Sequence, residues 1–260
     1  MSSSRVAVLG YGAIGQEVAD ILARGDIRRA ELAGVVTRGG STGVVHQLSV
    51  RDAIERSDVI VECAGPEALV THAPSIVAAG RTLVVTSVGA LGDLTVRRRL
   101  DAGPGRWVTT AGAVGGLDIL AAASRYAPFD FVQLTTTKHP EALRQPWMDE
   151  SEVATLLRLR EPTTLFVGAA REAGRSFPTS LNVALSVSLA ARTDDVLVTV
   201  RADPGAERTT HEIRARHPLG DYDLRVNNRP SPWRPGTSAV VSYAVARTLQ
   251  LVLDPRGDTL

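Results

Sequence analysis

Apolar and polar residues alternate in blocks over residues 1–110. Short runs of β-branched and other apolar residues are typical of strands buried on both faces of a sheet, and helical spacing of apolar residues separates several of them. The strand-like runs are 6–9, 32–36, 59–61, 82–86 and 107–110, and the helical segments include 14–23, 67–79 and 95–100. This alternation predicts βαβ units and a parallel sheet, the arrangement of an α/β domain.

The pattern changes after residue 110. Strand-like segments there follow one another through turns, which favours a mixed or antiparallel sheet. The helical segments are 115–126 and 178–191, and the strand-like ones are 131–136, 196–202, 211–217 and 222–226. We therefore expect a second, α+β domain over 111–237. The last helix, within 238–260, is apolar on most faces and is expected to pack back on the first domain.

Three glycines follow the first predicted strand. Gly10, Gly12 and Gly15 form G-x-G-x-x-G, and Ala13 and Ile14 open the following helix. The first glycine permits a tight turn, the second lets a pyrophosphate approach the backbone, and the third lets helix and strand pack closely. Strand, glycines and helix in this order predict a Rossmann dinucleotide-binding domain over 1–110. The alternative is a glycine-rich turn that binds no ligand.

The residue that reads the adenosine ribose is expected at the end of the second strand. An NAD-preferring site usually has a carboxylate there. This chain has Thr37 and Arg38, followed by a glycine- and hydroxyl-rich stretch at 39–43. A guanidinium and hydroxyls attract a 2′-phosphate, so the sequence favours NADP, or use of both NADP and NAD. The alternative is that Arg38 is a solvated surface arginine.

Two later strand ends are candidates for the walls of the cofactor cleft, because ligands of such sheets bind at the carboxyl ends of the strands. Ala64 and Gly65 follow the third strand, and residues 87–91 follow the fourth. We expect the latter segment at the nicotinamide end. Cys63, the single cysteine, lies in an apolar run and is interpreted as a small buried residue.

Composition fits an ordinary enzyme. The chain has 260 residues, of which 44% are hydrophobic, and 29 Lys plus Arg nearly balance 28 Asp plus Glu. Scattered basic residues give no nucleic-acid footprint. No apolar run reaches the roughly 18–20 residues of a membrane span, and the first strand starts too early for a signal peptide. We expect a cytoplasmic protein with a small-molecule substrate and no nucleic-acid or membrane partner.

Several separated motifs together resemble the L-aspartate dehydrogenase family over nearly the whole chain. They lie at 87–91, 111–118, 135–140, 177–184, 202–204, 211–213 and 230–238. The resemblance implies a Rossmann domain followed by a mixed α/β domain. It also implies interconversion of an amino acid with a 2-oxo acid and ammonia through an imino acid, such as reductive amination of oxaloacetate, with NAD or NADP. A homodimer is expected.

The resemblance also implies site residues. His211 matches the family's active-site histidine, and imidazole suits proton transfer near neutral pH. Asn182 and Ala113 match residues that contact the cofactor. Lys138 is a candidate for holding a substrate carboxylate. Without the resemblance, a strand histidine and a lysine are more often structural or surface groups. His139 is the next histidine to consider.

The chain departs from the family pattern where polar or cationic residues are usual. Family residues are replaced at Ala111, Thr137, Thr179, Ser180, Thr209, Arg234 and Gly236. A dicarboxylate needs fixed cationic or N–H partners, so these changes predict an altered substrate site, with Arg234 as the candidate replacement charge. Two alternatives remain open: an imine or carbonyl reductase without an ammonia step, and a non-catalytic nucleotide-sensing homologue.

Overall fold

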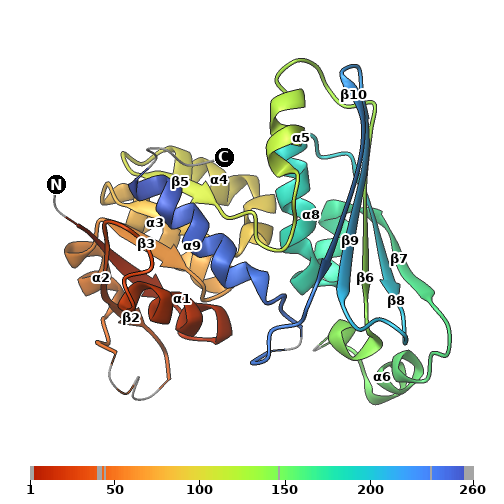
Figure 1. The fold of residues 1–260 in the computed structure, drawn as a ribbon, viewed down its shortest axis with the longest axis horizontal. Helices are drawn as coiled ribbons and strands as arrows, with labels where there is room; N and C mark the ends of the chain where they lie inside the picture. The colour runs from red at the N-terminus through yellow and green to blue at the C-terminus, as the bar shows by residue number, and fades with distance from the viewer. Residues whose placement is uncertain (1–2, 40–42, 44, 146, 235, 255–260) are drawn as a thin grey trace. The chain divides into compact units, whose positions relative to one another are not determined.

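A computed structural model describes residues 3–39, 43, 45–145, 147–234 and 236–254 of the chain. The chain divides into two units, each built on its own five-stranded sheet (Figure 1). The first unit comprises the chain up to Gly112 and, from Val241, the C-terminal helix, and the second comprises Ala113–Val240. In the described part of the chain, no helix has the length and apolarity needed to cross a bilayer.

The sheet of the first unit is parallel throughout, as the sequence predicts. Its strands are β1 (Ser4–Leu9), β2 (Ala30–Val36), β3 (Val59–Glu62), β4 (Thr82–Val85) and β5 (Arg106–Thr109), in the order β2-β1-β3-β4-β5. β1 and β3 are buried along most of their length. The strand order reverses between β1 and β3, and this is where doubly wound folds open a ligand crevice.

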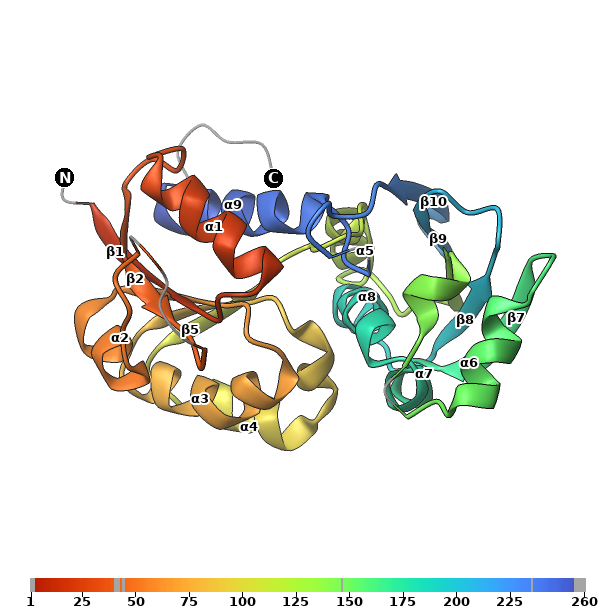
Figure 2. The same cartoon turned by 90° about the horizontal axis from the view of Figure 1, so that it is seen from below.

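Helices cover both faces of this sheet. They are α1 (Ala13–Ala23), α2 (Val50–Arg56), α3 (Pro66–Ala78), the 3₁₀ turn η1 (Val88–Gly92), α4 (Leu94–Asp101) and α9 (Val240–Leu253). Figure 2 shows α1 and α9 on one face and α3 and α4 on the other. Val245 and Leu249 of α9 are fully buried in the core formed with β1 and α1. The N–H of Arg28 donates to Gln250 Oε1 at 3.0 Å, so the last helix is also tied by a polar contact.

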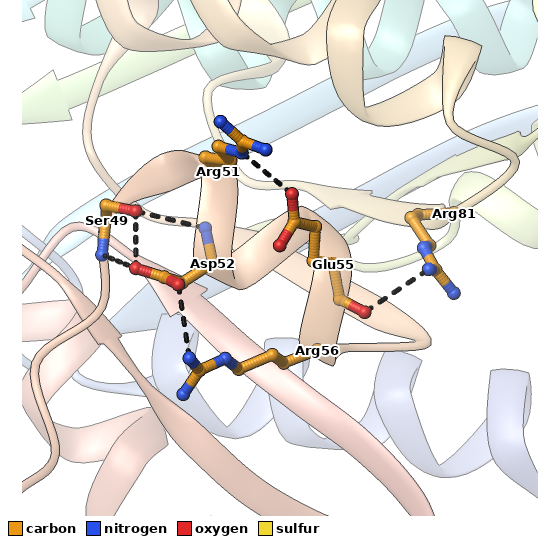
Figure 3. A network of polar contacts seen from close by, with 6 residues as sticks. All are labelled: Ser49, Arg51, Asp52, Glu55, Arg56 and Arg81. Atoms are coloured by element: carbon orange, nitrogen blue, oxygen red, sulfur yellow. Dashed lines mark hydrogen bonds and ion pairs between the residues drawn. The ribbon is translucent and has the colours of Figure 1, made fainter.

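Helix α2 was not predicted from the sequence, because its start signal is a polar cap rather than an apolar stripe. The Ser49 hydroxyl accepts from the Asp52 N–H at 3.0 Å, and the Asp52 carboxylate accepts from the Ser49 N–H at 3.4 Å (Figure 3). This capping box satisfies N–H groups that the first helical turn leaves free. Arg56 lies 3.4 Å from the other Asp52 oxygen, and hydrogen bonding from Ser49, followed by the Arg56 charge, lowers the pKa of that carboxyl.

The sheet of the second unit is mixed, also as predicted. Its strands are β6 (Phe131–Lys138), β7 (Thr163–Ala169), β8 (Val196–Ala202), β9 (Thr209–His217) and β10 (Gly220–Asn228), in the order β10-β9-β6-β8-β7. Only the β6–β8 pair is parallel among the described strands of this sheet. The edge strand β7 has no counterpart in the sequence prediction.

Helices cover one face of this mixed sheet, and no described helix covers the other, which is called the open face below. The helical elements are α5 (Leu117–Ala123), the 3₁₀ turn η2 (Pro140–Leu143), α6 (Glu150–Leu157), α7 (Ala170–Ser176) and α8 (Pro178–Ala191). Figure 1 shows α5 and α8 on the same side of the strands. Burial alternates along β6, where Val132, Leu134, Thr136 and Lys138 are buried and their neighbours are more exposed. Alternate residues of a strand share a face, so these four point to the covered side.

Candidate active site

The glycine loop of the first unit fits a dinucleotide. Gly10 has φ +102°, and a Cβ there would lie 2.6 Å from the Ala64 Cα. A Cβ on Gly15 would collide with the Gly10 carbonyl oxygen, whereas one on Gly12 would meet nothing within 4 Å. Gly10 and Gly15 therefore allow the backbone to pack closely, and Gly12 leaves open space in front of the helix.

The start of α1 is suited to an anion. Gly12 is its N-cap residue, no side chain caps it, and its first turn carries no acidic residue. The N-terminus of a helix carries partial positive charge and unsatisfied N–H groups, which bind phosphates. Open space at Gly12 directly before Ala13 and Ile14 is thus the cradle that a pyrophosphate requires.

The backbone amides of the β3–α3 turn are bound within the protein. The N–H groups of Ala64 and Gly65 both donate to Glu62 Oε1 at 2.9 Å. These amides are therefore occupied, and the turn can form a wall of the crevice but does not offer these two donors to a ligand. Glu62 was not singled out from the sequence, although a carboxylate inside the apolar run 59–63 was a visible signal.

The predicted ribose-reading position carries no carboxylate. Thr37 follows β2 directly, and its Oγ1 accepts from the Gly39 N–H at 3.3 Å. Gln47 donates to the Thr37 carbonyl oxygen at 3.4 Å. The Arg38 side chain is exposed. Residues 40–42 of the expected phosphate-binding stretch lie outside the described residues.

In the second unit, the pairing of β6 with β9 brings the predicted histidine and lysine to one face. Thr136 of β6 lies opposite His211 of β9, and Thr136 Oγ1 and His211 Nδ1 share a hydrogen bond of 3.0 Å. Lys138 follows on the same face of β6. The exposed fractions are 0% for Thr136, 3% for His211 and 5% for Lys138. Three chemically active side chains are thus gathered under the helical layer.

Burial shifts the pKa values of both titratable groups in this cluster. Burial, and secondarily the charge of Lys138, lowers the pKa of His211 to about 3. Burial lowers the pKa of Lys138 to about 8. The sequence-based expectation that His211 titrates near neutral pH is therefore wrong for the unliganded protein, because that expectation had no account of desolvation. His211 is a neutral imidazole at pH 7, and Lys138 is the group that titrates close to it.

Lys138 stands out in two further ways. It is the only lysine in the sequence; all the other basic side chains apart from histidine are arginines. Within the described residues, no carboxylate forms an ion pair with it, and burial is the sole cause of its pKa shift. A buried cation without a counter-charge is costly, and a bound anion relieves that cost. The single occurrence of lysine was a signal in the sequence that its motif alone did not convey.

The other predicted residues of this unit lie at separate places. Asn182 is a partly buried residue of α8, and its carbonyl oxygen accepts from the Ser186 hydroxyl at 2.8 Å. The Ala113 carbonyl oxygen accepts from the Asn228 side chain at 2.7 Å, an anchor that the sequence did not reveal. Arg234 is exposed in the loop after β10. The structure does not bring Arg234 into the buried cluster.

Two other histidines have local structural roles. His139 caps the η2 turn, where its Nδ1 accepts from the Glu141 N–H at 3.3 Å. His217 is buried, its Nδ1 accepts from the Leu219 N–H at 3.1 Å, and its Nε2 lies 3.0 Å from the Ala127 carbonyl oxygen. Both nitrogens of His217 are thereby used, which fixes its neutral tautomer.

One of the departures from the family pattern does not lie in the buried cluster. Thr137 alternates with Thr136 and Lys138 and therefore faces the open side of the sheet. Together with Arg201, Thr210 and Arg225 it borders a polar depression there. Its replacement therefore does not border His211 directly, because a one-residue step in a strand reverses the face. Thr209 lies two residues before His211 on β9 and therefore shares its face of the sheet.

Family models match both halves of the chain. The model described as the aspartate dehydrogenase C-terminal domain matches residues 118–252, and that described as the NAD-binding domain of homoserine dehydrogenase matches residues 10–103. The first covers the strands that carry Lys138 and His211, and the second covers the glycine loop.

Whole-chain relatives agree with these matches. The L-aspartate dehydrogenase of Pseudomonas aeruginosa is 34% identical, with 94% of this chain and 96% of that protein covered, and that of Methanosarcina barkeri is 32% identical, with 96% and 97% covered. The crystal structure of aspartate dehydrogenase from Thermotoga maritima superimposes with a TM-score of 0.77 over 99% of this chain and 98% of that chain, at 24% identity. The chain belongs to the L-aspartate dehydrogenase family and is an NAD(P)-dependent amino-acid dehydrogenase.

Proposed function

We propose that the protein catalyses the reductive amination of oxaloacetate to L-aspartate, or the reverse reaction, with NADPH as its preferred reductant. The 2-oxo acid, ammonium, NADPH and one proton give the amino acid, NADP⁺ and water. The observation that carries this proposal is the buried cluster of Thr136, Lys138 and His211, in which a neutral imidazole lies on the same sheet face as a cation that forms no ion pair with any described residue.

His211 serves as the proton-transfer group. Water must leave the carbinolamine, which forms when ammonia adds to the keto carbon, and that step moves protons between nitrogen and oxygen. A neutral imidazole accepts a proton first and returns it later. Thr136 fixes the ring through Nδ1, so Nε2 is the nitrogen left for the substrate.

Lys138 holds a substrate carboxylate. The ammonium form is present below a pH of about 8, and no described carboxylate forms an ion pair with it. Binding of an anionic substrate also supplies negative charge close to His211, which raises the pKa of the imidazole and helps it to accept a proton.

We predict a pH dependence that belongs to Lys138. In the wild type, kcat/KM falls as the pH rises through about 8, because the amine loses its proton. Lys138→Arg keeps a cation at all working pH values and should retain activity without this falling limb, whereas Lys138→Met should raise the KM for the 2-oxo acid steeply. If the limb persists in Lys138→Arg, another group titrates there. If Lys138→Arg is as inactive as Lys138→Met, the lysine does more than hold a charge.

Lys138 should also make the free energy of unfolding depend on pH. Stability should rise with pH where kcat/KM falls. Its folded-state pKa of about 8 lies below the ordinary value of 10.5, so the unfolded chain binds the extra proton between these values and stability rises with pH over that window. Lys138→Met should remove this dependence and increase the free energy of unfolding near pH 7. Denaturant unfolding of both proteins at pH 7 and pH 10 provides the measurement.

NADP preference is proposed from Thr37 and Arg38, where no carboxylate repels a 2′-phosphate. Arg38→Ala should weaken NADPH binding by about 1–3 kcal/mol and leave NADH binding nearly unchanged, because only NADPH carries the phosphate. Titration calorimetry with the two reduced cofactors measures the difference. Arg28→Ala, at another exposed arginine of the same unit, is the control. Equal weakening of both cofactors by Arg38→Ala would contradict the assignment.

The substrate itself is tested with a panel of 2-oxo acids in the presence of ammonium. Oxaloacetate, 2-oxoglutarate and pyruvate differ in the position or presence of a second carboxylate. We expect oxaloacetate to have the highest kcat/KM. Because family residues are replaced at Ala111, Thr209 and Arg234, a higher value for pyruvate or a longer acid would show that the substrate site has diverged.

We also propose a homodimer, formed through the open face of the second sheet. Arg214 pairs there with Asp223 at 3.4 Å and Arg216 with Asp221 at 3.6 Å, and Leu197 exposes an apolar side chain on the same face, on β8, with β6 between it and β9. A surface that carries charges of both signs and exposed apolar side chains can pair with its own copy across a two-fold axis. Light scattering should give a dimer for the wild type and a monomer for Leu197→Glu. A monomeric wild type would rule the dimer out.

A further inference from the structure

Glu62 is a buried carboxylate that the proposed chemistry does not use. It is the last residue of β3 and its exposed fraction is 0%. Its Oε1 accepts from the N–H groups of Ala64 and Gly65 at 2.9 Å and from the Ser87 hydroxyl at 2.8 Å, and its Oε2 accepts from the Ser87 N–H at 2.9 Å. One side chain thus binds the turn after β3 and the turn after β4.

The contacts suit the ionised form. All four partners donate, three of them through backbone N–H groups, and a carboxylate is an acceptor only. Burial raises the pKa of Glu62, and the four hydrogen bonds oppose that shift. A protonated carboxyl or an amide in this place would direct a donor toward other donors.

The two turns lie on one side of the switch point. In the sheet order β2-β1-β3-β4-β5, the turns after β1 and β2 border the adenosine half of a dinucleotide crevice, and the turns after β3 and β4 border the other half. The turn after β3 meets the glycine loop through main-chain contacts that do not involve the Glu62 side chain: Gly10 packs against the backbone of Ala64, and the Cys63 N–H donates to the Leu9 carbonyl oxygen at 2.7 Å.

We propose that Glu62 is a positioning residue that fixes the nicotinamide side of the cofactor crevice. It acts through Ala64, Gly65 and Ser87 and does not itself contact the cofactor. The proposal rests on the placement of the cofactor at the β1–β3 switch point.

The test compares two probes in Glu62→Gln. NADPH spans the whole crevice, whereas 2′-phospho-ADP-ribose lacks the nicotinamide and reports on the adenosine and pyrophosphate part. We expect the Kd for NADPH to rise by about 10–100-fold, through loss of well-placed contacts, and the Kd for the fragment to change by less than about 2-fold. A general structural defect would weaken both probes together.

Two serine variants supply a milder test and its control. Ser87→Ala removes one donor to Glu62 and should raise the Kd for NADPH by about 3–10-fold without affecting the fragment. Ser57→Ala removes another buried serine hydroxyl, at the opposite end of β3; Ser57 is 1% exposed against 6% for Ser87, and its oxygen has no hydrogen-bond partner among the described residues. It should leave both affinities unchanged.

The outcomes separate this proposal from the cofactor site on which it rests. Wild-type affinity for NADPH in Glu62→Gln and Ser87→Ala, or equal weakening of NADPH and the fragment, would overturn the role of Glu62. If Glu62→Gln does not fold, Ser87→Ala alone decides. If Gly12→Val also binds both probes normally, the crevice itself has been misplaced, and the result no longer concerns Glu62 alone.

Discussion

Replacing His211 with alanine is expected to lower kcat by about 10²–10⁴-fold while cofactor affinity stays nearly unchanged. The imidazole is buried and neutral, lies on the same sheet face as Lys138, and is hydrogen-bonded by Thr136 through Nδ1 alone, whereas the buried ring of His217 uses both of its nitrogens within the protein. His211→Asn should lose as much activity, because an amide is polar but cannot transfer a proton. Steady-state kinetics on the best substrate of the panel, with cofactor titrations in parallel, provide the measurement.

A matched pair of threonine variants serves as the control for this result. Thr136→Val removes the hydroxyl that bonds His211 Nδ1 at 3.0 Å, and Thr137→Val makes the same change one residue later, on the open face. Only Thr136→Val should lower kcat. Full activity of His211→Ala would transfer the proton-transfer role to another group, with Lys138 and His139 the next to test.

The second large effect is expected at Gly12. Gly12→Val should lower cofactor affinity by at least about 100-fold, because its branched side chain fills the space in which the pyrophosphate must approach the helix. The thermal transition of the apo-protein should change little, since a Cβ at this position meets nothing within 4 Å and the backbone φ is −84°. Calorimetric titration and thermal unfolding measure the two properties separately.

Gly10→Val is the informative contrast. There a side chain would collide with the backbone of Ala64, and φ is +102°, so this variant should lose both stability and cofactor binding. Normal cofactor binding by Gly12→Val would show that the glycine motif is a turn without a ligand. Unfolding of Gly12→Val would show that the open space in front of α1 is smaller than described.

Local sequence patterns predict most of the fold. Apolar runs predict the five strands of the parallel sheet, and the glycine spacing predicts the turn from Leu9 into α1, because both depend on residues close together in the chain. The mixed sheet was predicted from successive strands. Its edge strand β7 was missed, because residues 163–169 follow no regular apolar alternation and their burial is mostly partial.

The contacts of the candidate site could not be predicted from the sequence, because only the fold brings these residues together. Residues 25 positions apart meet at Glu62 and Ser87, and 75 positions separate Thr136 from His211, so no local pattern reveals either contact. The pKa of His211 depends on burial under helices and on the charge of Lys138, neither of which is visible along the chain. The orientation of Thr137, in contrast, follows from strand alternation alone and was within reach of the sequence.

We propose that this enzyme transfers a hydride to carbon and places ammonia nitrogen on the same atom. Purified protein is incubated with oxaloacetate, ¹⁵N-ammonium and NADPH deuterated at the transferred position of the nicotinamide, and the products are analysed by mass spectrometry. We predict aspartate that carries both ¹⁵N and deuterium. Deuterated malate without nitrogen would contradict the account in favour of a carbonyl reductase, and tight binding of NADPH without any labelled product, from oxaloacetate or from the other 2-oxo acids, would contradict it in favour of a nucleotide-sensing protein.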